Sequence, residues 1–214
     1  VKTPGVVFAL ATAVRVLTRE GDAVLIQQPV YDPYAGVVKS NKRELVVNPL
    51  QCTDGIYTVD YADFEKKIIE HEVKLFLLCS PHNPVGRVWT EEELRKMGEI
   101  CLKHNVLVVS DEIHCDFTYP DHRHTVFASL GAEHAFNSII CTAPSKTFNL
   151  AGLEASNIFI PDYTVRKRFQ EEMGRVAVSG VNAMGLVACE AAYRYGRQWL
   201  DELLAYLAGN IDFI

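Results

Sequence analysis

Three polar residues that could do chemistry together each follow an apolar run of the chain. Lys146 lies among serine, threonine, asparagine and glycine residues, which is unusual for a solvated charge but suits an amine that condenses with an aldehyde. Asp111 follows the apolar run 106–110. Asn83 lies in a turn after the run 73–79. The carboxyl ends of parallel strands meet at one edge of a sheet, so we expect the three groups to converge there.

Each of these residues alone has an ordinary explanation. A lysine after a strand is usually an exposed loop charge, and carboxylates and Asn-Pro-x-Gly sequences are common in turns. The order of several short motifs along the chain indicates a site instead. They are Gly5-Val-Val, Pro29-Val-Tyr31, Asn83-Pro-x-Gly86, Asp111-Glu-x-His114 and Ser145-Lys146.

The elements that must carry these motifs follow from the hydrophobic pattern. Strand-like runs alternate with helical patterns, which predicts an α/β fold with a mostly parallel sheet. Asp60 is expected to be an N-cap, and Thr90-Glu-Glu-Glu93 fits a capping box. From Tyr163 onward the pattern is helical, with a break at Gly196. We predict strands over 23–28, 44–47, 73–79, 106–110, 138–142 and 155–160, and helices over 6–19, 33–40, 61–71 and after Thr90.

The bulk composition excludes several classes of protein. The chain has 214 residues, 49% of them hydrophobic, with a mean hydropathy of +0.04, which is enough to bury a core. No apolar stretch approaches the roughly 20 residues of a membrane span, and residues 1–5 lack the pattern of a secretion signal. The net charge of −6 gives no electrostatic footprint for nucleic acid. Six scattered cysteines without a CxxC pair favour a reduced, cytoplasmic protein over a disulfide scaffold.

Both ends of the chain are abrupt. Residues 1–5 run directly into a helix start, and the stretch from Tyr206 to Ile214 ends inside an apolar helical pattern. We therefore expect this sequence to be a fragment of a longer protein.

Five motifs taken together resemble one enzyme superfamily, from residue 3 to about residue 180. They are Thr3-Pro-Gly-Val-Val7, Pro29-Val-Tyr-Asp32, Ser80-Pro-His-Asn-Pro-Val-Gly86, Ser110-Asp-Glu-Ile-His114 and Ser145-Lys-Thr-Phe-Asn149. In order and spacing, this set resembles the fold-type-I pyridoxal-phosphate (PLP) enzymes of the class I/II aminotransferase superfamily. Within that superfamily it is most similar to the cystathionine β-lyase group of carbon–sulfur lyases. The resemblance implies a three-layer α/β sandwich in which residues 1–214 form the PLP-binding large domain. An N-terminal segment and a smaller C-terminal domain would then be absent from the chain.

The resemblance assigns Lys146 and Asp111 to the centre of the chemistry. It implies that Lys146 forms the internal aldimine with the PLP aldehyde and then takes the Cα proton of the substrate as general base. Burial or a nearby cationic centre would keep the amine partly neutral. Asp111 would face the protonated pyridine nitrogen, which keeps the ring electron-poor.

Further cofactor contacts also follow from the resemblance. Asn83 would hydrogen-bond the 3′-oxygen of the ring. Tyr31 would stack on the ring face, with a core aromatic as the alternative. The phosphate would sit at the start of the first helix, where the amides of Val6 and Val7 are free.

Four other residues leave choices open. Ser145 would add a hydroxyl donor to the phosphate, and Thr142 either does the same or simply ends a strand. His114 departs from the tyrosine of many aminotransferases but matches the lyase group, and it either contacts the 3′-oxygen or packs beneath the ring. Glu154 stands where aspartate-type transaminases carry a phosphate-binding arginine, so the phosphate must rely on amides, hydroxyls or another subunit.

The run Pro-Asp-His-Arg-His at 120–124 offers a different kind of site. His122 and His124 flank Arg123, a spacing that could suggest a metal, but no carboxylate or cysteine cluster supports one. We expect a solvated loop here and no metal site.

The function implied by the resemblance is a PLP-dependent carbon–sulfur β-lyase. It would cleave cystathionine or a related L-cysteine derivative to a thiol, pyruvate and ammonia. Two other functions stay open: a class I/II aminotransferase, which shares the steps up to Cα deprotonation, and a non-catalytic PLP-binding regulatory module. The resemblance further implies a homodimer that acts on a small amino-acid substrate, with no nucleic-acid or membrane partner.

Overall fold

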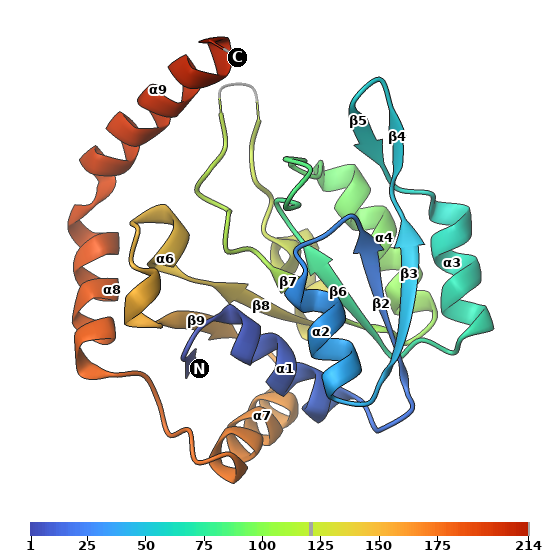
Figure 1. Cartoon of the computed structure of the whole chain (residues 1–214). Helices are drawn as coiled ribbons and strands as arrows, with labels where there is room; N and C mark the ends of the chain where they lie inside the picture. The colour runs from blue at the N-terminus through green and yellow to red at the C-terminus, as the bar shows by residue number, and fades with distance from the viewer. Residues whose placement is uncertain (120–121, 214) are drawn as a thin grey trace.

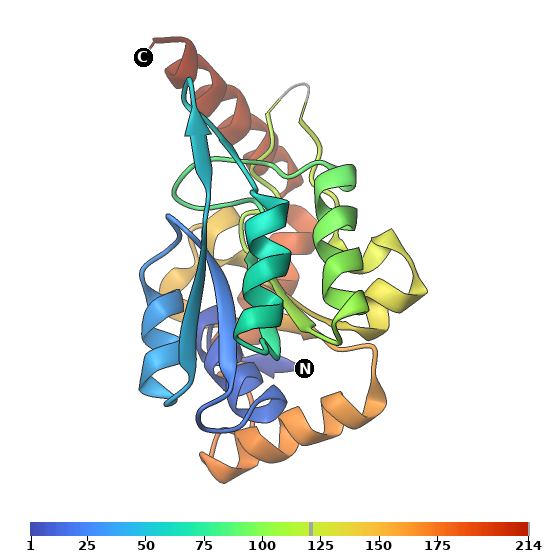
Figure 2. The same cartoon turned by 90° about the vertical axis from the view of Figure 1, so that its right-hand side faces the viewer.

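A seven-stranded sheet forms the centre of the computed structural model, which describes residues 1–119 and 122–213 (Figures 1 and 2). The strand order is β1-β9-β8-β7-β6-β2-β3. The strands from β3 to β8 in this order are parallel, and β9 pairs antiparallel with β8 and β1. This confirms the predicted mostly parallel α/β fold. The strands are β1 (Lys2–Thr3), β2 (Ala23–Gln28), β3 (Glu44–Pro49), β6 (Leu75–Cys79), β7 (Leu107–Asp111), β8 (Ser138–Thr142) and β9 (Ser156–Phe159).

Helices cover both faces of the sheet, and α8 and α9 run in succession along one side of the molecule (Figure 1). A separate hairpin is formed by β4 (Gln51–Thr53) and β5 (Ile56–Thr58). The helices are α1 (Val6–Leu17), α2 (Pro33–Ser40), α3 (Tyr61–Glu70), α4 (Glu91–Lys103), α5 (Ala132–Phe136), α6 (Pro144–Thr147), α7 (Tyr163–Arg175), α8 (Ala183–Tyr195) and α9 (Arg197–Phe213), with 3₁₀ turns η1 (Phe127–Leu130) and η2 (Ala151–Leu153).

Two apolar clusters flank the sheet and give the fold its three layers. On one side, α1, α2 and α7 pack through side chains such as Leu10 and Phe169. On the other side, α3 and α4 pack through Phe64 and Met97. Successive residues of β6 alternate between the two clusters, so almost the whole strand is buried. A continuous apolar run is what a parallel strand covered on both faces requires.

The predicted helix starts are confirmed. Asp60 caps α3 by accepting a 3.0 Å hydrogen bond from the Asp63 amide. Thr90 Oγ1 accepts from the Glu93 amide at 3.2 Å, while a Glu93 carboxylate oxygen accepts from the Thr90 amide at 2.8 Å. These bonds satisfy first-turn amides that have no partner within their own helix.

The boundaries differ from the predictions by a few residues, and the shortest elements were not predicted. Helix α1 ends at Leu17, two residues early, and β3 continues to Pro49. The strands β1, β4 and β5 are too short to show a period in the sequence. Gly196 separates α8 from α9, as expected, and Ile214 lies outside the described residues. Within the described part of the chain, no helix combines the length and apolar character needed to cross a membrane.

Candidate active site

The carboxyl ends of β6, β7 and β8 lie side by side, as the sequence predicted. In the parallel register, Cys79 is opposite Asp111, and Asp111 is opposite Cys141. The Ser80 amide donates to the Asp111 carbonyl at 2.9 Å, which continues the ladder past the last residue of β6. The segments that carry Asn83, Asp111 and Lys146 therefore all leave the same edge of the sheet.

Asp111 is a buried carboxylate, and no cationic side chain among the described residues bonds to it. Its Oδ2 accepts a 3.1 Å hydrogen bond from the Tyr34 hydroxyl, and its Oδ1 accepts from the Ile113 amide at 3.1 Å. Burial raises the pKa of Asp111 to about 6, and the two hydrogen bonds and the charge of Lys146 only partly oppose this rise. A carboxylate in this state gains from a cationic partner in the remaining space.

Lys146 lies on the four-residue helix α6, directly after β8. Its side chain is exposed, which differs from the burial expected of it. Its charge acts on both Asp111 and His114, so the amine is within electrostatic reach of both residues.

Tyr31 and Asn83 lie on neighbouring loops that are bonded to each other. The Tyr31 amide donates to the Asn83 carbonyl at 3.0 Å. Tyr31 is 44% exposed, so the alternative of a core aromatic is wrong. Asn83 is partly buried.

The start of α1 offers unused amides. Gly5 precedes the helix with a φ of 92°, a conformation that favours glycine. Amides of the first turn have no partner within a helix, and no described group accepts from those of Val6 or Val7. The first turn also carries no acidic residue, so this end suits an anion.

Three of the residues whose roles the sequence left open lie on or near α6. Ser145 is partly buried on α6. Thr142 ends β8 and lines a cleft beside α8. Glu154 is exposed and left-handed, with a φ of 47°, at the end of η2.

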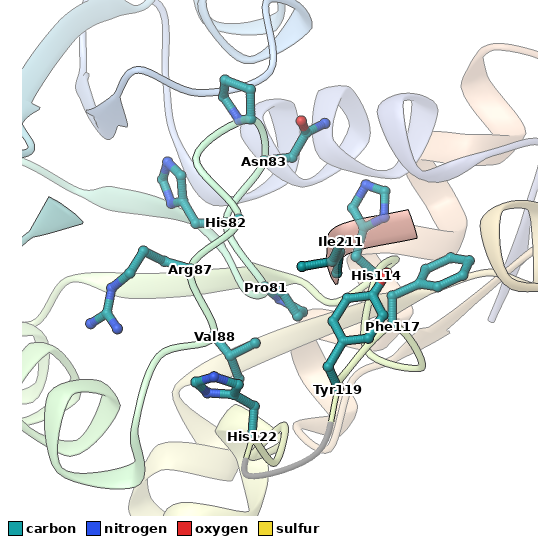
Figure 3. Close-up of a pocket in the computed structure, with 12 residues that line it drawn as sticks. Pro81, His82, Asn83, Arg87, Val88, His114, Phe117, Tyr119, His122 and Ile211 are labelled. Atoms are coloured by element: carbon teal, nitrogen blue, oxygen red, sulfur yellow. The ribbon is translucent and has the colours of Figure 1, made fainter. Parts of the chain in front are cut away.

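His114 lines a cleft of about 500 Å³ beside the Asn83 loop. Figure 3 shows the residues from Pro81 to Val88 on one side of this cleft, and His114, Phe117 and Tyr119 on the other. Burial, and secondarily the charge of Lys146, lower the pKa of His114. A neutral imidazole is therefore favoured at neutral pH.

The family assignment rests on a match over the whole chain. The family model of aminotransferase class I and II matches residues 1–214. The chain belongs to the aminotransferase class I and II family.

The chain spans about half the length of the relatives and solved structures that it matches. Cystathionine beta-lyase PatB of Bacillus subtilis (strain 168) is 50% identical over 210 residues, which are 98% of this chain and 54% of that protein. A PLP-bound structure from Clostridium difficile 630 has a TM-score of 0.97 and 48% identity, covering 100% of this chain and 55% of its own. The PLP-bound C-S lyase from Staphylococcus hominis has a TM-score of 0.93 and 34% identity, covering 100% and 53%.

The structure of this aminotransferase class I and II chain also corrects the expectation for the His122–His124 run. The His122–His124 run was expected to be a solvated loop, but the His124 side chain is only 8% exposed and bonds through Nε2 to Glu112 at 2.8 Å. The local sequence is polar, but its partner lies twelve residues upstream. His122 and Arg123 are exposed as expected, and Pro120 and Asp121 lie outside the described residues. Within the described residues, no cluster of three His, Cys, Asp or Glu residues could hold a metal.

Sequence reasoning also missed three buried polar residues. Tyr34 has no exposed surface, and its hydroxyl donates to Asp111. Glu112 is 1% exposed and accepts hydrogen bonds from Ser110, His124 and Phe127. His82 is 1% exposed and bonds through Nε2 to the Pro29 carbonyl at 2.8 Å, joining the Asn83 loop to the Tyr31 loop. For each of these three residues, the sequence signal of burial is weak: a polar residue stands inside an apolar or motif-rich stretch.

Proposed function

We propose that the protein is a PLP-dependent carbon–sulfur β-lyase that releases a thiol, pyruvate and ammonia from cystathionine or a related L-cysteine derivative. The observation that carries this proposal is the buried Asp111 at the shared edge of the sheet, with the amine of Lys146 in electrostatic reach. The 50% identity to cystathionine beta-lyase PatB and the likeness to a PLP-bound C-S lyase support the lyase reaction. Residues 1–214 would be the cofactor-binding large domain of this enzyme.

The residues of the chain fit PLP. Asp111 has a raised pKa and bonds to no cationic side chain within residues 1–119 and 122–213, so a protonated ring nitrogen would complete its surroundings. The free amides of Val6 and Val7 suit a phosphate. When bound, PLP supplies an electron-poor ring that absorbs the electrons left at the substrate Cα.

The other proposed site residues orient the cofactor. Asn83 would donate to the 3′-oxygen of the ring, and Tyr31 would cover one ring face with its exposed side chain. His114, on the wall of the same cleft, would lie near the 3′-oxygen or beneath the ring. The Ser145 hydroxyl would add to the phosphate donors.

Lys146 would hold and move protons. Its amine would attach to the cofactor aldehyde, and once free it would take the substrate Cα proton as general base. The resulting ammonium could then protonate the departing thiolate. Lys146→Ala is expected to lose the covalent attachment, so borohydride treatment would no longer link cofactor to protein.

An aminotransferase is the second candidate, because the family model itself is that of aminotransferase class I and II. The two reactions differ in where the proton goes after Cα deprotonation. Cystathionine incubated with the holoenzyme should yield pyruvate without any keto-acid acceptor. Strict dependence on an acceptor would contradict the lyase and support the aminotransferase. Cofactor binding without turnover of either kind would indicate a regulatory module.

We also propose that the enzyme is a cytoplasmic homodimer. Large apolar side chains are exposed on α8 and α9, including Met184 at 69% and Tyr195 at 78%, and a second subunit could cover them. All six cysteines are free, which suits a reducing compartment. Light scattering of the holoenzyme and cell fractionation test the two parts separately.

A further inference from the structure

A partly buried hydrogen bond joins the helix that carries Lys146 to the segment that follows Asp111. Thr147, the residue after Lys146, has no exposed surface. Its Oγ1 donates to Oδ2 of Asp116 at 2.7 Å. Asp116 lies two residues after His114, so the bond links two parts of the proposed site that are 31 residues apart in the chain.

Helix α6 needs such an external tie. It has only four residues, and a helix this short gains little stability from its own hydrogen bonds. Its orientation, and with it the direction of the Lys146 side chain, must be fixed by tertiary contacts.

Aromatic packing also holds α6, at the residue that follows the helix. Phe148, directly after the helix, meets Tyr193 edge-on with ring centroids 5.7 Å apart and lies 5.9 Å from the Trp199 ring. A Cβ atom on Gly196 would lie 2.5 Å from Phe148 Cε1, so the ring has little room to move. The aromatic contacts join the end of α6 to α8 and α9, and Thr147 supplies a hydrogen bond to the segment that follows Asp111.

We propose that Thr147 and Asp116 are positioning residues that fix the Lys146 amine relative to Asp111 and His114. This inference rests on the proposed function of Lys146. The hydroxyl of Thr147 ties α6 to the Asp116 carboxylate. Because Asp116 belongs to the segment that follows Asp111, the bond fixes the position of α6 relative to that segment. Neither residue takes part in proton transfer itself.

The electrostatic coupling of the site fits this role. The charge of Lys146 lowers the pKa of both Asp111 and His114, after the larger effect of burial on each. The interaction between two charges changes with the distance between them, and Asp111 is the buried member of its pair with Lys146. A shift of α6 would therefore change the titration of the site as well as its rate.

The test compares two substitutions of Thr147 in the holoenzyme. Thr147→Val keeps the shape but removes the hydroxyl, whereas Thr147→Ser keeps the hydroxyl. We expect Thr147→Val to lower kcat by about 10- to 100-fold with little change in KM. It should also shift the pH midpoint of the visible absorbance of the bound cofactor. Thr147→Ser keeps the hydroxyl donor and Asp116→Asn keeps an oxygen acceptor. Both variants should therefore retain most of the wild-type kcat and the wild-type pH midpoint of the absorbance.

A second readout needs no cofactor. In the cofactor-free protein, Thr147→Val should change the rate at which an acetylating reagent modifies Lys146, measured by peptide mass spectrometry against the exposed Lys39 as an internal standard. The inference would be overturned if Thr147→Val kept the wild-type kcat, the wild-type pH midpoint of the cofactor absorbance and the wild-type ratio of Lys146 to Lys39 acetylation. If the valine variant does not fold, the same measurements on Asp116→Ala against Asp116→Asn decide it.

The outcomes for the wild-type holoenzyme and for Lys146→Ala separate this inference from the proposed function. If the wild-type holoenzyme released no pyruvate from cystathionine, the proposed function would fail whatever Thr147 does. If Lys146→Ala still turned over cystathionine at the wild-type rate, the role of Lys146 would fail, and the positioning inference with it. If Lys146→Ala is inactive but Thr147→Val is unchanged, only the positioning role fails.

Discussion

The Tyr34 hydroxyl donates a 3.1 Å hydrogen bond to Asp111 across 77 residues of sequence. Tyr34 lies on α2 and has no exposed surface, so the bond is formed out of contact with water. This hydrogen bond lowers the pKa of Asp111 and partly opposes the larger effect of burial. Tyr34 therefore favours the ionised form of Asp111 and helps to fix the direction of its carboxylate.

Tyr34→Phe should weaken cofactor binding and catalysis without changing the fold. The substitution keeps the ring but removes a hydrogen bond to a charged group, which corresponds to about 10-fold in affinity or rate. Titration of the cofactor-free protein with PLP, followed by absorbance, and kcat for cystathionine measure the two effects. An unchanged affinity and rate would show that the Tyr34 hydroxyl is not needed to hold Asp111.

Asp111 should make the cofactor-free protein less stable as pH rises. Its pKa is raised from the usual 3.8 to about 6, so the folded state holds the proton more tightly than the unfolded state. This contribution is fully present below pH 3.8 and is lost as pH rises through about 6. The full change is roughly 3 kcal/mol. Urea unfolding across this range measures it, and Asp111→Asn is the control that should remove this part of the pH dependence. Parallel curves for the two proteins would contradict the prediction.

Glu112 should be worth far more to stability than an exposed carboxylate. It is buried and accepts from Ser110 at 2.9 Å, from His124 at 2.8 Å and from the Phe127 amide at 2.9 Å. Glu112→Ala leaves three buried donors without an acceptor, and we expect a loss of about 3–5 kcal/mol in unfolding free energy. Glu112→Gln, which keeps the shape, should lose less. If Glu112→Ala lowered the unfolding free energy by less than about 1 kcal/mol, the prediction would be wrong, and water would have to replace the lost acceptor.

Gly196 should not tolerate a side chain. An added Cβ would lie 2.5 Å from both Phe148 Cε1 and the Ala192 carbonyl. We expect Gly196→Ala to lower the unfolding free energy by about 1–3 kcal/mol through overpacking. Gly209→Ala, on α9 with no atom within 4 Å of the new Cβ, is the matched control and should be neutral or slightly stabilising. Equal melting temperatures for the two variants would show that α8 and α9 yield to the added methyl group.

Much of the fold was accessible from local patterns. The strands of the parallel sheet are continuous apolar runs, and the caps of α3 and α4 are short sequence signals, so both were predicted within a few residues. The shared edge of Asn83, Asp111 and Lys146 followed from the rule that parallel strands end together.

The contacts across the chain could not be predicted in the same way. Nothing near Tyr34 in the sequence points to Asp111, and the polar run around His124 gives no sign of its buried partner. Both errors concern tertiary pairing, which overrides what the local composition favours. The resemblance to a family pointed to the proposed cofactor contacts, such as Lys146 and Asp111. The buried residues that hold them, such as Tyr34, are visible only in the structure.

Asp111 and Glu112 are consecutive and buried, yet they serve opposite halves of the molecule. The partner of Asp111, Tyr34, belongs to the apolar cluster of α1 and α2, whereas Phe127, beside Glu112, belongs to the cluster of α4. Side chains alternate between the two faces along a strand. A one-residue shift of register at the end of β7 would therefore exchange Asp111, the proposed cofactor ligand, with Glu112, which holds the loop around Phe127. Insertions and deletions are thus far less tolerable at this point than most substitutions.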